Sequence, residues 1–389
     1  MTNYIPTQSI STTDQHALSL VSGDSVLLNP GIVLSASGAG ADGIHSGGIE
    51  DTILLRSGSR VSSENGTGIH VQAGSVVEID AGASVSGRLQ GVNIDASNRT
   101  DIMSTLLLNY GSITGEIGVR SNNSRLIEEQ IVNHGSILGT NGAGLRLDGA
   151  VSVINTGTIE GSNGIVLGNP QALRVITNSG TIIGKDGPAI SFNTANPYGD
   201  VVVNTGHIVG NISFSGQSNG SLIRGDLYDG RGGTITGTIS LGSGHDRAFG
   251  GAGAETFEVR SGNDTIDGGG GHDTVLFNQN RSLYDVSTAG GVTTVASKGT
   301  PATDTDTLTN VRFLKFDDTT EILYNTKPDS VGLTQTTFAE NALTGTPIAT
   351  VAARDAEGDA LTYTLVDPTG TFGLVGNALV LLKALDFET

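Results

Sequence analysis

The sequence contains neither cysteine nor tryptophan, and only 4% of its 389 residues are aromatic. Without cysteine, neither a disulfide nor a thiolate metal site can form. The opening residues MTNYIPTQSISTTDQ show no basic segment followed by an apolar one, so we expect no cleavable signal peptide. Because no run of 18 apolar residues occurs, we also expect no transmembrane segment.

Positive charge is scarce. The chain has 20 lysines and arginines against 39 aspartates and glutamates, which gives a formal net charge of −19. A surface of this sign repels nucleic acid and anionic lipid and attracts cations. We therefore expect no nucleic-acid partner, and we expect a soluble protein surrounded by cations.

Glycine is abundant, with 58 residues, which is about twice the average usage. Hydrophobic residues make up 36% of the chain, mostly as short runs between Gly and Asn, and long patterns of period 3.6 are hard to find. Short apolar runs bounded by turn residues are typical of strands. The sequence therefore predicts an all-β protein.

The pattern N-x-G-x-I-x-G occurs five times, at 109–115, 133–139, 155–161, 178–184 and 204–210. The spacings of 24, 22, 23 and 26 residues, together with weaker copies upstream, predict eight coils of a stacked β-solenoid from about residue 26 to 214. We expect an inward ladder of isoleucines (Ile113, Ile137, Ile159, Ile182 and Ile208). We also expect turn asparagines that bond from coil to coil (Asn109, Asn133, Asn155, Asn178 and Asn204).

These motifs resemble the right-handed parallel β-helices of bacterial surface and secreted proteins. The resemblance implies an N-terminal segment at 1–20 and a parallel β-helix at 21–240. It is specific for architecture and weak for function.

From residue 241, the chain can be cut into blocks of nine: LGSGHDRAF, GGAGAETFE, VRSGNDTID and GGGGHDTVL. Glycine holds position 4 of each block (Gly244, Gly253, Gly262 and Gly271). An acid holds position 6 (Asp246, Glu255, Asp264 and Asp273). A residue that can face inward holds position 8 (Ala248, Phe257, Ile266 and Val275). The pattern resembles the RTX, or haemolysin-type, calcium-binding repeat G-G-x-G-x-D-x-U-x.

The resemblance implies a parallel β-roll at 241–277, in which turn carbonyls and aspartates supply the hard oxygen ligands that Ca²⁺ prefers. Because successive turns alternate sides, it implies two sites, one at Asp246 and Asp264 and one at Glu255 and Asp273, each with nearby glycine carbonyls. Glu255 departs from the family's aspartate, and Leu241, Val259 and Arg260 replace leading glycines. The other interpretation is an acidic, glycine-rich linker.

Without the ion, facing carboxylates repel and the glycines keep their backbone entropy, so we expect this segment to stay unfolded. His245 and His272 share a block position but lie on opposite sides of the predicted roll. We expect them to be exposed and not to bind zinc.

A β cap is expected at 278–326. LYDVSTAGGVTTVASKG alternates as a hairpin, and DTDTLTNVRFLKFDDTTEIL is similar to a segment that often follows RTX rolls. We expect Leu308, Val311, Leu314 and Phe316 to be core residues.

Residues 327–389 resemble a partial cadherin-like β-sandwich through A-E-N at 339–341, D-A-E-G-D at 355–359 and L-D-F-E at 385–388. The resemblance implies calcium ligation by Asp355 and Glu357 toward the preceding linker. It implies the same for Glu340, Asp386 and Glu388 toward a next domain. Because about 60 residues fall short of a complete domain, we expect a fragment whose missing part holds a type I secretion signal. The other interpretation is a sandwich with solvated acidic loops.

Three functions follow as hypotheses. The first is a calcium-binding extracellular or cell-surface structural and adhesion protein, secreted by a type I route and folded by calcium outside the cell. Its candidate partners are cell-surface glycans and other copies of itself. The second is an enzyme acting on acidic polysaccharide, a lyase or an epimerase, since such enzymes also join RTX modules to β-helices. The third is a passive spacer.

The enzyme hypothesis needs a general base beside a cation. The basic residues are scattered, although Arg120 and Arg146 hold similar positions in neighbouring coils, and no HExxH or G-x-S-x-G motif occurs. We therefore name no catalytic residue and expect no enzyme.

Overall fold

The computed structural model describes residues 1–95, 104–122, 128–169, 172–215, 225–299, 304–324, 328–339, 341–355 and 359–385. They fall into two compact units, Met1–Glu321 and Ile322–Thr389, which are treated separately. Within these ranges the chain is all-β, with one short 3₁₀ helix, η1 (Arg281–Leu283).

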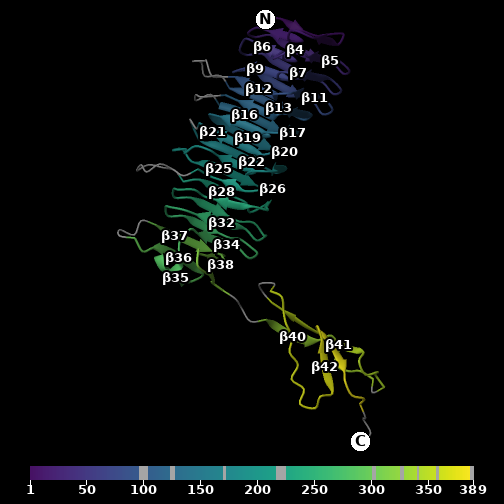
Figure 1. The fold of residues 1–389 in the computed structure, drawn as a ribbon, viewed down its shortest axis with the longest axis vertical. Coiled ribbons are helices and arrows are strands. Elements are labelled where there is room, and N and C mark those ends of the chain that lie inside the picture. Colours follow the sequence, from purple (N-terminus) through teal and green to yellow (C-terminus); the bar gives the residue numbers. More distant parts are fainter. Residues whose placement is uncertain are drawn as a thin grey trace. The chain divides into compact units, whose positions relative to one another are not determined.

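Three long sheets make up the first unit, and each is assembled from strands that recur along the chain (Figure 1). Sheet A contains, in spatial order, β1 (Asn3–Tyr4), β4 (Ser25–Leu28), β7 (Thr52–Leu55), β10 (Val76–Ile79), β13 (Thr105–Asn109), β16 (Glu128–Asn133), β19 (Ala150–Asn155), β22 (Arg174–Asn178), β25 (Asp200–Asn204), β28 (Leu227–Asp229), β31 (Arg247–Phe249), β33 (Thr265–Asp267), β37 (Thr305–Thr309), β36 (Val292–Ser297) and β35 (Tyr284–Ala289).

Sheet B contains β2 (Ile10–Thr12), β5 (Val33–Ala36), β8 (Arg60–Ser63), β11 (Ser84–Gly87), β14 (Ser112–Gly115), β17 (Ser136–Gly139), β20 (Thr158–Gly161), β23 (Thr181–Gly184), β26 (His207–Val209) and β29 (Thr234–Ile235). Sheet C contains β3 (Leu18–Leu20), β6 (Ile44–Ser46), β9 (Ile69–Gln72), β12 (Gln90–Asp95), β15 (Ile117–Ser121), β18 (Leu145–Asp148), β21 (Ile165–Gly168), β24 (Ile190–Phe192), β27 (Ile212–Ser213), β30 (Thr238–Ser240), β32 (Thr256–Val259), β34 (Thr274–Phe277), β38 (Phe313–Lys315) and β39 (Thr320–Ile322).

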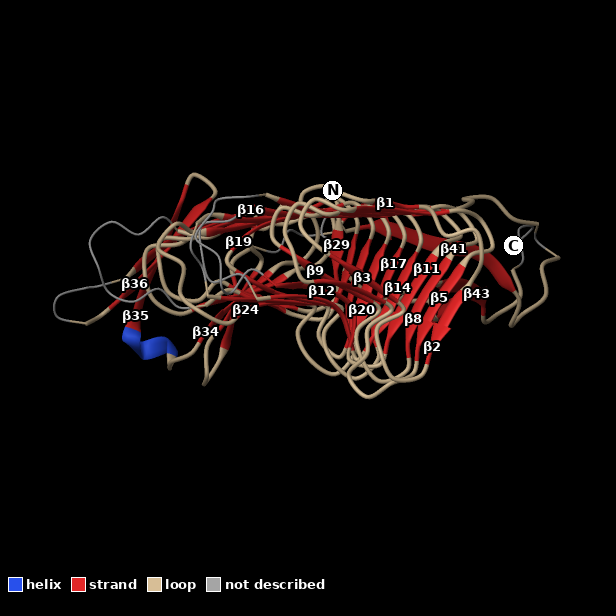
Figure 2. Ribbon diagram, turned by 90° about the horizontal axis from the view of Figure 1, so that it is seen from above, coloured by secondary structure: helices blue, strands red, loops and turns tan. Residues whose placement is uncertain are grey.

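From β1 to β30 the chain visits sheets A, B and C in turn, so that three strands complete one coil of a parallel β-helix. Figure 2 shows strands of sheet B lying side by side, from β2 to β20. The first 20 residues lie within this stack, since β1, β2 and β3 pair in parallel with β4, β5 and β6. The coils therefore begin upstream of residue 26, where the sequence motifs become recognisable, and the expected boundary at residue 20 is not seen.

The interior of the β-helix is an apolar ladder, as the repeat predicts. Ile113, Ile137, Ile159, Ile182 and Ile208 pair in register along sheet B and are at most 1% exposed. Val85 extends the ladder upstream and Ile235 extends it downstream. Stacking identical β-branched side chains removes apolar surface from water and fills the narrow interior.

The predicted asparagine ladder is also present and fully buried. Each side-chain Nδ2 donates to the Oδ1 of the asparagine one coil downstream. The four steps from Asn109 through Asn133, Asn155 and Asn178 to Asn204 measure 2.8, 2.8, 2.7 and 2.8 Å. Nδ2 of Asn133 also donates to the Thr158 carbonyl, at 3.1 Å. The ladder thus satisfies buried polar groups at the last position of each sheet A strand, where the chain turns toward sheet B.

The nonapeptide segment continues the β-helix without a break. β31 and β33 extend sheet A, and β32 and β34 extend sheet C, whereas sheet B ends at β29. Ala248 pairs with Tyr228 of the last three-strand coil, and Phe257 pairs with Ile239. The predicted roll is therefore a two-sided extension of the coil stack, built on strands that are already ordered.

The expected cap follows. β37 and β38 add one more parallel turn, and Leu308, Val311, Leu314 and Phe316 are at most 3% exposed. β35 and β36 form the predicted antiparallel hairpin around Gly290 and Gly291, which both have positive φ, and β36 pairs antiparallel with β37. This reversal ends the parallel stacking of sheet A, so that the edge of the roll is covered.

In the second unit, the described residues form a four-stranded antiparallel sheet in the order β40 (Asp329–Leu333), β41 (Pro347–Arg354), β43 (Ala378–Leu381) and β42 (Phe372–Val375). Its small core gathers Ile348, Ala349, Leu379 and Leu381, with Phe338 and Phe372 packed against them. The cadherin-like assignment of this unit stays a prediction.

Candidate metal centre

The nonapeptide turns bring acidic side chains together on each side of the roll, in the pairs that the alternation predicts. On the sheet A side, the backbone N–H of Asp246 donates to Oδ1 of Asp264 at 2.9 Å. On the sheet C side, the N–H of Glu255 donates to Oδ1 of Asp273 at 2.7 Å. All four side chains are at most 4% exposed.

The turn glycines allow this close stacking. A Cβ built on Gly262 would lie 1.6 Å from the Gly244 carbonyl oxygen, and one on Gly271 would lie 2.1 Å from the Gly253 carbonyl oxygen. Gly262 and Gly271 also have φ of +115° and +95°, a region that other residues rarely adopt. The carbonyls of Gly244 and Gly253, both predicted ligands, therefore face the next turn of the roll.

The sheet A pair belongs to a longer column of aspartates that the sequence analysis missed. The N–H of Asp200 donates to Oδ1 of Asp226, and the N–H of Asp226 donates to Oδ1 of Asp246, each at 2.7 Å. At the other end, the N–H of Asp264 donates to Oδ1 of Asp306 at 2.9 Å. The column thus begins in the β-helix, crosses the roll and ends in the cap.

A weaker sequence pattern is common to the aspartates of this column. Asp226, Asp246, Asp264 and Asp306 each stand two residues before a buried side chain of sheet A: Tyr228, Ala248, Ile266 and Leu308. Asp226 and Asp306 lack the full glycine turn, so the nonapeptide pattern does not include them.

The second oxygen of several of these carboxylates has no hydrogen-bond partner among the described residues. Oδ2 of Asp226, Asp246, Asp264 and Asp273 is buried and unpaired, and so is Oδ1 of Asp304, next to the column. An unpaired buried carboxylate oxygen costs free energy unless a cation neutralises it. Among the residues that the structure describes, no side chain pairs with these oxygen atoms.

The pKa values of these acids are also consistent with buried carboxylates that no cation neutralises. Burial raises the pKa of Asp246 to about 6. Burial, with the charge of Asp246 added, raises the pKa of Asp264 to about 9. Burial and the charges of Asp200 and Asp246 raise the pKa of Asp226 to about 8. On the other side, burial raises the pKa of both Glu255 and Asp273.

At its upstream end, the column receives a cation from the chain itself. Arg174 is fully buried and pairs with Asp200 through Nε to Oδ1 at 2.7 Å and Nη2 to Oδ2 at 2.6 Å. Its guanidinium also lies 5.0 Å from the centre of the Phe192 ring. The arginine neutralises Asp200, whereas Oδ2 of Asp226, Asp246 and Asp264 has no hydrogen-bond partner within the described part of the chain.

Residues 249–279 match the family model described as the RTX calcium-binding nonapeptide repeat (4 copies). Neither a curated protein nor a solved structure matches the chain. Glu255, Asp264 and Asp273 fall within the matched repeats, whereas Gly244 and Asp246 lie just before them.

The repeats imply that the chain binds calcium, and the residues present fit that ion. Unpaired carboxylate oxygens beside backbone carbonyls are hard oxygen donors, which Ca²⁺ prefers in sets of six to eight. Asp246 with Asp264 and Glu255 with Asp273 would hold the ion, which neutralises charge that the fold has buried. Asp226 and Asp306 extend the first of these two donor sets.

The histidines of the roll behave differently from each other. His245 is exposed, as expected, and its Nδ1 accepts the N–H of Asn263 at 2.9 Å. His272 is half-buried, contrary to expectation, because its Nε2 lies 2.7 Å from Nη1 of the buried Arg312.

The predicted site of the second unit is only partly described. Asp355 follows β41, and its Oδ1 accepts the N–H of Asp359 at 3.0 Å. Glu357, Glu340, Asp386 and Glu388 lie outside the described residues, so this site stays a prediction.

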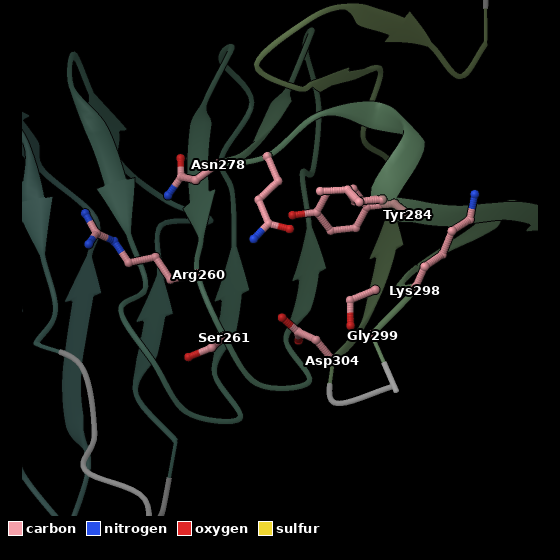
Figure 3. A pocket seen from close by; sticks show the side chains of 10 residues that line it. Arg260, Ser261, Asn278, Tyr284, Lys298, Gly299 and Asp304 are labelled. Carbon is pink, nitrogen blue, oxygen red and sulfur yellow. The ribbon is translucent and has the colours of Figure 1, made fainter. Parts of the chain in front are cut away.

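A pocket of about 430 Å³ lies where the roll meets the hairpin, lined by Arg260, Tyr284, Lys298 and Asp304 among others (Figure 3). Its cations have acidic partners, since Arg260 lies 3.3 Å from Glu258 and Lys298 lies 3.4 Å from Asp285. Burial raises the pKa of Tyr284, which disfavours it as a base. Asp304 is the acid that lines this pocket, and burial raises the pKa of its carboxyl to about 6.

Among the described residues, no helix has the length and apolar character that a membrane crossing requires.

Proposed function

We propose that the protein is an extracellular structural and adhesion protein whose downstream coils fold only when calcium is bound, after export by a type I route. The column of buried, unpaired carboxylates carries this proposal. Because free calcium is scarce in the cytosol, these acids repel one another there and keep the roll open for export. Outside the cell the ion closes the roll onto the preformed β-helix.

An adhesive or spacing role agrees with the architecture. A coil stack presents long, regular faces, and such faces suit glycans or other copies of the chain as partners. Secretion is typical of proteins that carry RTX repeats, and it places the chain where calcium is plentiful. We propose no catalytic role for the calcium sites, since their acids are buried against the turns.

The test is far-UV circular dichroism of the whole chain in chelator, followed by a calcium titration. We expect a calcium-dependent gain of β signal in the wild type and a weaker, right-shifted response in Asp264→Ala. Asp186→Ala is the matched control, because Asp186 is an exposed aspartate on the β-helix. If the wild type shows no calcium response, the proposed folding switch is wrong.

A second candidate function, action on acidic polysaccharide, is favoured by one observation. Arg120 and Arg146 pair in register on neighbouring strands of sheet C. Burial raises the pKa of the nearby Asp148 carboxyl, and the two arginines act in the opposite direction. Paired cations beside a carboxyl with a raised pKa resemble what uronate chemistry needs.

This second function predicts that calcium-loaded protein depolymerises or epimerises alginate or pectin, and that Arg146→Ala abolishes the activity. Arg60→Ala is the control, since Arg60 is an exposed arginine on sheet B. Unchanged polysaccharide after incubation with the wild type would reject it.

A further inference from the structure

Three histidines from three successive coils converge on a single aspartate at the upstream end of the β-helix, far along the chain from the roll. His45 in β6 and His70 in β9 are paired in register, and His16 precedes β3. Oδ2 of Asp42 lies 2.7 Å from Nδ1 of His45, 3.6 Å from Nδ1 of His70 and 3.7 Å from Nδ1 of His16.

The imidazole rings are packed against one another as well as against the carboxylate. The rings of His16 and His45 are stacked with centres 4.2 Å apart, and His70 meets His45 edge-on at 4.8 Å. Nε2 of His70 is buried and has no hydrogen-bond partner among the described residues. A histidine cluster of this kind has more nitrogen atoms than a single carboxylate can satisfy.

The carboxylate is held firmly and remains charged. Asp42 is 5% exposed, and its Oδ1 accepts the N–H of Thr67 at 2.8 Å. Burial acts to raise the pKa of Asp42, but hydrogen bonds led by that from His45 outweigh it and hold the pKa well below its usual range. The imidazole side chains are 20% to 32% exposed, so a small ion reaches them from solvent.

The spacing of these atoms suits a small tetrahedral ion. Metal–nitrogen distances of about 2.0–2.1 Å place the ligand atoms of a tetrahedral zinc site about 3.3 Å apart. The three distances from Oδ2 of Asp42 bracket this value, and the ligand atoms of His16, Asp42 and His45 all lie within 4.8 Å of one another. Imidazole nitrogen suits zinc and its neighbours in the first transition row, whereas calcium prefers oxygen.

We propose that His16, Asp42, His45 and His70 form a binding site for a transition-metal ion of the zinc class, separate from the calcium column. In this site Nδ1 of His16 exchanges its hydrogen bond from the N–H of Asp42, now 2.8 Å long, for the ion. His16, Asp42 and His45 supply the compact ligand group, and His70 adds a ligand whose Nδ1 lies 3.6 Å from Oδ2 of Asp42. The bound ion would link the first three coils of the β-helix through their side chains.

The test is isothermal titration calorimetry of the whole chain with Zn²⁺, in saturating calcium so that the calcium sites are filled. We expect one saturable zinc site, weakened at least about tenfold in both His45→Ala and His70→Ala. His134→Ala is the matched control, because His134 is an exposed histidine of the same β-helix, stacked on Tyr110. Circular dichroism of each variant shows whether it folds.

Co²⁺ provides a readout that does not depend on any variant. We expect the intense visible absorption of tetrahedral, nitrogen-ligated Co²⁺ in the wild type, removed by one equivalent of Zn²⁺. The proposal is overturned if the wild type shows no saturable binding, if the bound Co²⁺ spectrum is that of an octahedral oxygen site, or if folded His45→Ala/His70→Ala binds zinc as tightly as the wild type.

Discussion

At the scale of single residues, the fold depends on polar groups that are buried and satisfied by their copies in the next coil. Asn155 accepts from Asn133 and donates to Asn178, with no water needed. In the aspartate column a backbone N–H donates to Oδ1 of the next aspartate, and Oδ2 of Asp226, Asp246 and Asp264 has no partner among the described residues. The asparagine ladder is therefore stable by itself, whereas the aspartate column needs a cation.

Replacing Asn155 by alanine tests the asparagine ladder. The change leaves a donor on Asn133 and an acceptor on Asn178 without partners, and each such buried group costs about 1–3 kcal/mol. We expect the free energy of unfolding to fall by about 2–4 kcal/mol, measured by urea denaturation in calcium. Asn141→Ala, in an exposed turn, is the control, and an equal loss in both variants would contradict this account.

The aspartate column predicts an unusual response to pH in chelator. Asp246, Asp226 and Asp264 have folded pKa values of about 6, 8 and 9, above the unfolded value of 3.8, so the folded roll holds more protons than the unfolded chain. Stability must then fall as the pH rises from about 4 through these values.

We therefore expect the chelated protein to have a lower thermal midpoint at pH 8.5 than at pH 5.5, followed by scanning calorimetry. Calcium should reverse the trend, because the ion binds the ionised carboxylates. A chelated midpoint that rises with pH would show that these acids are not buried as charged groups in the folded state.

At the scale of elements, the important feature is that sheets A and C run from the β-helix through the roll, while sheet B ends at β29. The roll is therefore templated by β28 and β30 and does not need to nucleate by itself. Removing calcium should open the stack from this end and leave the upstream coils closed, because the isoleucine and asparagine ladders of those coils carry no charge.

Hydrogen–deuterium exchange with peptide-level detection checks this directly. In chelator we expect β31, β32, β33, β34 and β38 to exchange quickly, while β14, β17 and β20 stay protected as in calcium. Uniform exchange along the chain would mean that the coils unfold as one cooperative unit.

Much of this architecture is readable from the sequence, and the reasons are physical. A coil must repeat its inward residue and its turn residue, so Ile137 and Asn133 recur at a visible period. The sequence does not predict Asp226 and Asp306 as part of the column, because these residues lack the glycine turn that precedes Asp246 and Asp264. The register of the sheets brings these four aspartates together, and this register cannot be predicted from the sequence.

The histidine cluster is another feature that depends on the register of the sheets and is therefore hard to predict from the sequence. The repeated G-I-H at 43–45 and 68–70 marks two equivalent coil positions, but only the register places His16 beside Asp42. A change of period is typical of a domain boundary, so the sequence predicts the roll as a separate module. In the structure two of the three sheets pass through that boundary unchanged.

At the scale of the whole molecule, the two compact units make separate cores. The unit of Ile322–Thr389 packs around Ile348 and Leu381, and the calcium column lies entirely within Met1–Glu321. The calcium-dependent closing of the roll should thus belong to the first unit.

A truncated chain ending at Glu321 tests this division. We expect the midpoint of its calcium titration, followed by circular dichroism, to match that of the full chain, because the column from Asp200 to Asp306 is retained. A large shift of the midpoint would mean that the second unit contributes to closing the roll.

The pairing of Arg174 with Asp200 has a consequence for how the chain responds to its surroundings. At this pair the counter-charge is covalently attached, so Asp200 needs no ion from solution. Downstream, within the described residues, the unpaired carboxylates of Asp226, Asp246 and Asp264 need a counter-charge from the solution, so order there depends on the local ion concentration. One arginine therefore marks the border between a constitutive part of the protein and a conditional part, and moving that arginine along the column would move the border with it.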